Sequence, residues 1–106
     1  ARALIRRFGI RAPGPDVPVR SLSGGNVQKV VLAREVTQGK PLLLIDQPTR
    51  GVDIGATEAI HDEILSRRAD GAAILLISVQ LDEVLALADR RLLLFGGRIV
   101  AALDAA

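Results

Sequence analysis

Apolar residues in this chain fall into short blocks that Gly, Pro and charged residues separate. Two of these blocks, Leu42–Ile45 and Ala72–Ile77, are unbroken apolar runs, which is typical of parallel strands covered on both faces. Between them, apolar residues at four-residue spacing predict a helix that follows residues 53–55 and runs to about Arg68. These apolar positions are Ala56, Ile60 and Ile64.

The N-terminal part of the chain predicts two helical segments around a loop. Residues 1–9 end with a glycine and have the pattern of the last turns of a helix, whereas the prolines within 11–20 predict an extended loop. Ser23 is a candidate N-cap, and the helix that it opens runs to about Gln38, where glycine and proline follow. We expect the buried stripe of this helix to comprise Val27, Val30, Val31 and the aliphatic stem of Arg34.

The C-terminal part predicts a short helix and a hairpin. A pair of glycines separates the apolar segments 91–95 and 98–103, which predicts a hairpin with a tight turn. The order of strand, helix, strand, helix and hairpin predicts an α/β fold with a mainly parallel sheet, flanking helices and a C-terminal β-hairpin. The short helix spans 81–88, and its expected inward residues are Leu81, Val84, Leu85 and Ala88.

Composition narrows the classes of function. With 106 residues and 49% hydrophobic content, one domain with an aliphatic core is expected. The net charge is +2, but the basic residues are scattered in ones and twos, and only two aromatic residues occur, Phe8 and Phe95, so we expect no nucleic-acid binding. The lack of cysteine excludes disulfides and thiolate sites. No apolar run approaches the ~20 residues of a membrane span, and no secretory peptide is recognisable.

The segment Leu22–Lys29, with the sequence Leu-Ser-Gly-Gly-Asn-Val-Gln-Lys, carries candidate phosphate-binding chemistry. The first turn of a helix offers unpaired N–H groups and the positive end of the helix dipole to an anion. Glycines let phosphate oxygens approach the backbone without a Cβ in the way. Ser-Gly-Gly alone favours an ordinary capped helix, so the functional hypothesis rests on the whole segment.

The second candidate segment lies at the carboxyl ends of the predicted parallel strands, where α/β sheets bind ligands. Asp46 closes the first strand and Ser78–Val79 follow the second. A carboxylate at the end of such a strand can support Mg²⁺ beside phosphates, although an aspartate there is by itself usually a turn former or a helix cap. The sequence Gln-Pro-Thr-Arg-Gly-Val-Asp continues from Asp46 to Asp53.

Taken together, the two segments resemble the signature motif and the Walker B strand of ABC transporter ATP-binding proteins. The resemblance extends from about Ser21 to Leu103, and it identifies 1–106 as a C-terminal fragment of one nucleotide-binding domain, a partial P-loop NTPase (ABC ATPase) domain. The phosphate loop of Walker A, Gly-x4-Gly-Lys-Ser/Thr, is nowhere in the 106 residues. The ending Asn26-x-Gln28-Lys29 resembles the nucleoside and simple-sugar importer branch. The family's usual catalytic Glu and switch His are both absent from this chain, and in this respect it most resembles the second ATP-binding half of tandem nucleoside importers.

The resemblance also implies roles for single residues. Asp46 supports Mg²⁺ beside ATP, and Asp53 is the D-loop aspartate that communicates between two ATP sites. The residues expected to contact ATP from the signature segment are Ser23, Gly24, Gly25, Asn26 and Gln28.

Two positions depart from the family pattern. Gln47 stands where the catalytic Glu normally follows the Walker B aspartate, and an amide can orient water but has no useful basicity. Val79 stands where the switch histidine normally follows the next strand, and an apolar side chain cannot hydrogen-bond a γ-phosphate. Because both groups belong to one composite ATP site, the resemblance implies an asymmetric pair in which that site hydrolyses ATP poorly. The other site, completed by this chain's signature segment, is expected to be active.

By the resemblance, the function is ATP-driven import of a nucleoside or simple sugar, with ATP and Mg²⁺ bound in the complete assembly. The implied partners are membrane permease subunits, a second ATP-binding half and, indirectly, a solute-binding protein. The implied location is the cytoplasmic side of the plasma membrane, as a peripheral subunit. For the isolated chain we expect negligible ATP affinity, no ATPase activity, and self-association through the open edge of its sheet.

Two other classes of function remain open at this point. One is a soluble ABC ATPase of DNA repair or translation, which would be expected to keep the Glu and the His. The other is a non-catalytic interaction module with an α/β fold. His61 lacks a second metal ligand and is expected on a helix surface, and Asp82–Glu83 is expected to supply charge at a helix N-terminus rather than an acid/base pair.

Overall fold

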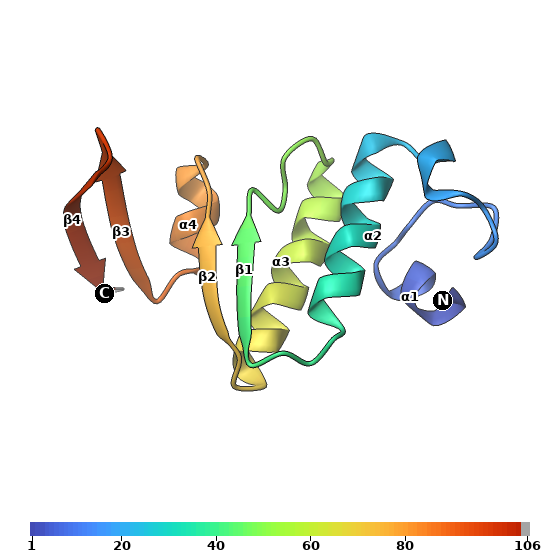
Figure 1. Cartoon of the computed structure of the whole chain (residues 1–106), viewed down its shortest axis with the longest axis horizontal. Coiled ribbons are helices and arrows are strands. Elements are labelled where there is room, and N and C mark those ends of the chain that lie inside the picture. The colour runs from blue at the N-terminus through green and yellow to red at the C-terminus, as the bar shows by residue number, and fades with distance from the viewer. Residues whose placement is uncertain (105–106) are drawn as a thin grey trace.

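The computed structural model of the chain describes residues 1–104. They form an elongated body with extents of 46 × 28 × 22 Å, which runs from a helix at the N-terminus to a hairpin at the C-terminus (Figure 1). The predicted order of strand, helix, strand, helix and hairpin is confirmed. The elements are α1 (Arg2–Arg7), a 3₁₀ turn η1 (Val19–Ser21), α2 (Gly24–Val36), β1 (Leu42–Asp46), α3 (Ile54–Ala69), β2 (Ala73–Ile77), α4 (Leu81–Leu87), β3 (Arg90–Phe95) and β4 (Arg98–Asp104).

The N-terminal helix α1 is fixed to the rest of the molecule by one ion pair and one aromatic ring. Gly9 ends it with φ of +61°, a left-handed conformation that glycine adopts without steric cost. Arg7 donates two hydrogen bonds to the Glu63 carboxylate on α3, at 2.8 and 2.7 Å. Phe8 is buried in the core. The segment before the loop therefore packs directly against α3.

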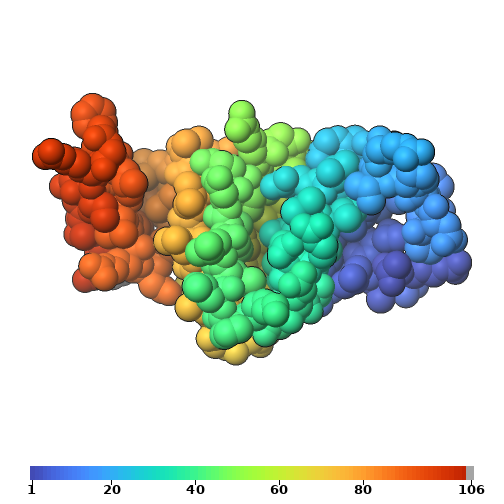
Figure 2. Space-filling model, viewed as in Figure 1, coloured from blue at the N-terminus to red at the C-terminus, as the bar shows by residue number. Residues whose placement is uncertain are grey.

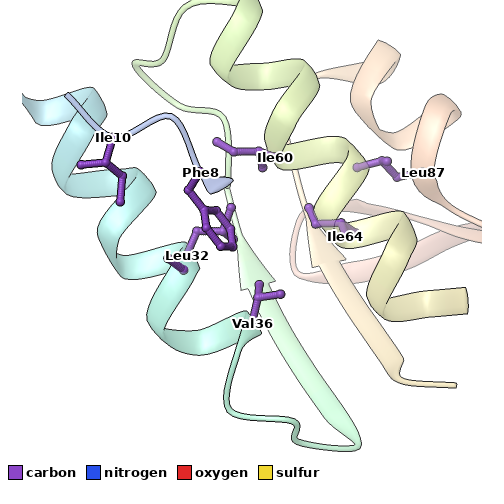
Figure 3. Close-up of a cluster of buried hydrophobic side chains, with 8 residues drawn as sticks. Phe8, Ile10, Leu32, Val36, Ile60, Ile64 and Leu87 are labelled. Atoms are coloured by element: carbon purple, nitrogen blue, oxygen red, sulfur yellow. The ribbon is translucent and has the colours of Figure 1, made fainter. Parts of the chain in front are cut away.

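The hydrophobic core lies where α2, α3 and the segment after α1 meet (Figure 3). Helix α3 buries the three residues that the sequence predicts, Ala56, Ile60 and Ile64. Their four-residue spacing places them on one helix face. The core cluster comprises Phe8, Ile10, Leu32, Ala33, Val36, Ile60, Ile64 and Leu87.

The prediction for the buried face of α2 is wrong, because the face that is buried is rotated by part of a turn from the predicted one. The helix buries Lys29, Leu32, Ala33 and Val36, whereas Val31 is 40% exposed and Arg34 is exposed. A lysine can face inward here because its Nζ donates a hydrogen bond to the Gly9 carbonyl at 2.9 Å, and its stem covers apolar surface. The positions predicted at 27 and 30 are only half-buried.

The parallel pair β1 and β2 is the sheet on which the candidate site stands. Leu42 to Asp46 pair in register with Ala73 to Ile77. Alternate residues of a strand point to opposite faces, and Leu43 faces the helices and is buried. On the other face the strand atoms lie uncovered in the view of Figure 2. The exposed apolar residues of this open face are Leu42, Leu44, Leu75 and Ile77.

The expectation that both strands are covered on both faces is therefore wrong for the described part of the chain. Leu44 is 71% exposed and Ile77 is 51% exposed, and nothing in residues 1–104 packs over that face. An unbroken apolar run predicts burial on both sides, but it does not say which segment supplies the cover.

The C-terminal elements differ from prediction in one respect. Helix α4 turns Glu83 and Leu87 inward, while Leu81 and Leu85, predicted to be buried, are 68% and 49% exposed. Glu83 can face inward because its carboxylate finds a partner there, the Thr49 hydroxyl. The other predicted inward residues, at 84 and 88, are half-buried.

Strands β3 and β4 form the predicted antiparallel hairpin, with a bulge between Leu93 and Leu94. Gly96 and Gly97 both have positive φ, 58° and 75°, as a tight hairpin turn requires. Among residues 1–104, no helix combines the length and the apolar content that a membrane crossing needs.

Candidate functional site

Ser23 caps helix α2 as predicted, and hydrogen bonds from Asn26 orient its side chain. Ser23 Oγ accepts hydrogen bonds from the Asn26 backbone N–H at 3.4 Å and from Asn26 Nδ2 at 2.8 Å. The side-chain amide oxygen of Asn26, Oδ1, in turn accepts from the backbone N–H of Arg11 at 2.8 Å. Both contacts use the serine oxygen as acceptor, so its O–H proton can be donated to another group.

A hollow of about 440 Å³ opens beside this helix terminus. Gly25 forms its floor together with the loop before α3: a Cβ at Gly25 would lie 3.6 Å from the Gly51 carbonyl oxygen and 3.8 Å from Val52 Cγ1. The first N–H groups of α2 have no carbonyl partner within the helix, and they lie at its positive end. The hollow is lined by Arg11, Ser23, Gly24, Gly25, Asn26, Lys29, Gly51, Val52 and Asp53.

Asp53 also lines the hollow, and it caps α3. Its Oδ1 accepts a hydrogen bond from the Ala56 N–H at 2.8 Å. That bond is the main reason why the pKa of Asp53 lies below its ordinary value, and the positive charges of Lys29 and Arg11 lower this pKa further. Four candidate residues of the signature segment, Ser23, Gly24, Gly25 and Asn26, thus share one surface with Asp53, although Asp53 caps a different helix.

The carboxyl ends of β1 and β2 carry the second group of candidate residues. Gln47 has a positive φ of 50°, which is uncommon for a residue with a side chain. Its backbone N–H donates to the Ile77 carbonyl at 2.8 Å, and its Oε1 accepts from the Val79 N–H at 3.3 Å. The Val79 side chain is 87% exposed. Gln47 therefore holds the segment after β2 in place, while Val79 points to solvent.

Asp46 ends β1 as an exposed carboxylate next to this contact. Within residues 1–104, no group of three or more His, Cys, Asp or Glu side chains could hold a metal ion by itself. Mg²⁺ is usually bound through one or two carboxylates together with phosphate oxygens and waters. Asp46 therefore fits a Mg²⁺ ion that arrives with nucleotide phosphates, rather than a metal held by the protein alone.

Gln28 connects the two groups. Its Nε2 donates to the carbonyl of Pro48 at 3.1 Å and, with a longer contact of 3.4 Å, to that of Gln47. Gln28 lies four residues after Gly24, one helical turn into α2. Its side chain faces the end of β1, not the hollow. The structure thus separates Gln28 from the other predicted ATP-contacting residues.

Several residues at these surfaces were missed by sequence reasoning. Arg11 and Lys29 add positive charge to the hollow; Lys29 ends the predicted signature segment but was not assigned a place in the site. Glu83 lies in the first turn of α4, as expected for a charge at a helix N-terminus, but it is only 2% exposed and its partner Thr49 is 5% exposed. His61 is 20% exposed and its Nε2 lies 3.3 Å from Glu83 Oε2, so it is not a simple surface residue.

The chain resembles import ATP-binding proteins over nearly its whole length. It is 42% identical to the guanosine import ATP-binding protein NupO of Bacillus subtilis, over 98% of this chain and 20% of that protein. It is 46% identical to the nucleoside import ATP-binding protein NupA of Lactococcus lactis, over 93% of this chain and 20% of that protein. The ribose import ATP-binding protein RbsA of Lacticaseibacillus paracasei is 46% identical over 97% of this chain and 21% of its own length. The chain thus spans about a fifth of these curated relatives. No protein-family profile matches it.

Solved structures agree with the relatives. An ATP-binding subunit of an ABC transporter superposes with a TM-score of 0.87 at 28% identity, over 96% of this chain and 42% of that one. A dimeric ATP-binding cassette in a post-hydrolysis state, bound to ADP and Pi, gives a TM-score of 0.86 at 21% identity over 99% of this chain and 45% of that one, and supports the fold alone. The predicted α/β class and ABC ATPase fold are therefore confirmed. The chain belongs to the family of ATP-binding proteins of ABC transporters.

Proposed function

We propose that the chain acts as the C-terminal, signature-bearing part of a nucleotide-binding domain in an ABC importer for a nucleoside or a simple sugar. The observation that carries the proposal is the hollow in which Ser23 and Gly25, at the start of α2, meet Asp53, at the start of α3. Relatives named for guanosine, nucleoside and ribose import support the class of solute.

In this proposal, the hollow completes an ATP site whose phosphate loop and Walker B strand belong to a second ATP-binding half. Ser23 donates its O–H to a terminal phosphate oxygen, because Asn26 occupies the serine oxygen from the other side. The N–H groups of Gly24 and Gly25 lie at the positive end of α2 and stabilise the same negative charge. Arg11 and Lys29 add positive potential around the hollow.

The edge that carries Asp46, Gln47 and Val79 contributes to the other ATP site of the pair. Asp46 would hold Mg²⁺ together with nucleotide phosphates, and the ion would supply positive charge beside those phosphates. Gln47 cannot accept a proton from water at neutral pH, and its Oε1 already accepts from the Val79 N–H. Val79 offers no hydrogen bond to a phosphate. This site therefore binds nucleotide and hydrolyses it slowly or not at all.

The open face of β1 and β2 supports the proposal that 1–106 is one part of a larger domain. The ATP-binding subunit with the same fold has more than half of its length outside the matched region. We propose that the part carrying the phosphate loop packs over Leu42, Leu44, Leu75 and Ile77. Without that cover, the isolated chain self-associates through this face and through the free strand edges.

The remaining partners and the location follow from the same role. An import ATP-binding subunit works with membrane permease subunits and, indirectly, with a solute-binding protein, and it sits peripherally on the cytoplasmic side of the membrane. The isolated chain lacks the phosphate loop, so we propose that it neither binds ATP tightly nor hydrolyses it.

ATP turnover by the assembled transporter tests the role of Ser23. Ser23→Ala removes the donor and should lower turnover by about a hundredfold or more, whereas loss of the helix cap should reduce stability by only about 1 kcal/mol. Ser66→Ala is the matched control, because Ser66 is an exposed serine on α3 away from the hollow. Turnover of Ser23→Ala equal to that of Ser66→Ala would reject the signature role and favour a non-catalytic module.

A further inference from the structure

The carboxylate of Glu83 is buried where three elements meet, and the proposed ATP chemistry does not use it. Its side chain is 2% exposed. Glu83 Oε2 accepts a hydrogen bond from the Thr49 hydroxyl, and His61 Nε2 lies 3.3 Å from the same oxygen. These contacts tie α4 to the loop before α3 and to α3 itself.

Burial of this carboxylate is costly, so its place in the fold needs a reason. A buried polar group without a partner costs about 1–3 kcal/mol, and more when it is charged. Within residues 1–104, Glu83 Oε1 has no hydrogen-bond partner. An apolar residue would fill the same space at lower cost, which suggests that the contact with Thr49 serves a purpose other than stability.

The Thr49 contact continues into the hollow through a chain of short contacts. The Thr49 carbonyl accepts from the Val52 N–H at 3.3 Å. Val52 and Gly51 in turn form the surface against which Gly25 packs, at 3.6 Å from the Gly51 carbonyl oxygen to a Cβ built at Gly25. A continuous series of contacts thus runs from Glu83 to the first turn of α2.

The other end of the chain of contacts is the segment after β2. Glu83 is in the first turn of α4, which begins directly after Gln80. Val79 precedes that cap and is tied to β1 by the bond from its N–H to Gln47. A shift of this segment therefore moves α4 and Glu83 with it.

We infer that Glu83 is a positioning residue that couples the Asp46–Gln47–Val79 edge to the Ser23–Asp53 hollow through Thr49. The inference rests on the proposed function, in which these two surfaces belong to different ATP sites. The state of nucleotide at the slow site thereby adjusts the geometry of the donors at the active site.

Amide hydrogen exchange on the chain tests the contact without ATP. Thr49→Val keeps the shape of the side chain and removes the hydroxyl, and it should raise exchange at Gly51–Asp53 and at the first turn of α2 by about tenfold. Thr49→Ser restores a hydroxyl and should return exchange toward the original rate. Glu83→Leu removes the acceptor and should act like Thr49→Val, whereas Asp82→Asn, an exposed neighbour on α4, should change nothing in the hollow. Changes confined to α4, or equal in Asp82→Asn, would overturn the inference.

Turnover by the assembled transporter then tests the coupling. Thr49→Val and Glu83→Leu should lower kcat about tenfold with little change in KM for ATP, and Thr49→Ser should recover most of the loss caused by Thr49→Val. If the unaltered assembly hydrolyses no ATP, the proposed function fails. If it hydrolyses ATP normally and both variants match Asp82→Asn, the proposed function stands and the coupling is rejected.

Discussion

Both faces of the β1–β2 sheet carry leucine and isoleucine side chains, but only one of the faces is covered. On the covered face, Leu43 is turned toward the helices and is 6% exposed. On the other, Leu44, its neighbour in sequence, is 71% exposed. Two leucines that are adjacent in sequence thus lie on a covered face and on an uncovered face of the same sheet. The comparison teaches that the described residues supply the core on the helix side, whereas the other face needs a cover from another segment.

The largest effect on stability should come from a substitution in the buried core on the helix side of the molecule. Ile60 is 1% exposed at the centre of the core, so Ile60→Ala should destabilise the fold by about 2–5 kcal/mol, a large share of the total for a small domain. Ile54→Ala is the matched control, because Ile54 is on the same helix and 82% exposed, and it should change stability by less than about 0.5 kcal/mol. Urea denaturation measures both. Equal losses would mean that the core is not where the structure has it.

A second effect concerns the open face. Leu44→Lys places a charge in the apolar surface and should weaken self-association at least about tenfold, since a buried leucine contributes about 1.5–3 kcal/mol. Val19→Lys changes an exposed apolar residue on η1, which is 46% exposed and away from the sheet, and should leave self-association unchanged. Analytical ultracentrifugation measures the distribution. A monodisperse monomer of the unaltered chain at high concentration would reject self-association.

The smallest effect is a dependence on pH at the rim of the hollow. The pKa of Asp53 lies below its ordinary value because the Ala56 N–H bonds to the ionised carboxylate. Its contribution to stability is therefore present above about pH 4, near the ordinary pKa of an aspartate, and is lost as the pH falls through its lower pKa in the folded state. Asp53→Asn keeps the oxygen acceptor but cannot ionise, so acidification should cost it less stability.

Asp62→Asn provides the control for this measurement, because Asp62 is an exposed aspartate on the same helix. Thermal unfolding between pH 6 and pH 3 compares the three proteins. A slope for Asp53→Asn that matches those of the other two would show that Asp53 does not favour its ionised form in the folded chain.

Local patterns in the sequence predict most of the elements and the residue that caps α2. Continuous apolar runs mark β1 and β2, the Gly-Gly pair marks the hairpin, and Ser23 caps α2 as expected. These features depend on residues a few positions apart, which a single sequence contains in full.

The buried charges could not be predicted in the same way. Lys29 and Glu83 are buried only because Gly9 and Thr49, far away in sequence, supply their partners. Charged residues are rarely buried unless they are paired, so a sequence without contacts favours the surface. The stripes of α2 and α4 were misplaced for this reason, since each inward face begins with a charged residue. The open sheet face was missed because apolar runs do not identify the segment that covers them.

Calorimetric titration with Mg-ATP tests the central claim most directly, first on the chain alone and then on its mixture with the matching Walker-bearing half. The account predicts no measurable binding to the chain alone, and tighter nucleotide retention in the mixture than in the Walker-bearing half by itself, with the gain lost in Ser23→Ala. Tight binding of Mg-ATP to the chain alone would contradict the account, because it would require a phosphate site outside the hollow and the carboxyl end of β1.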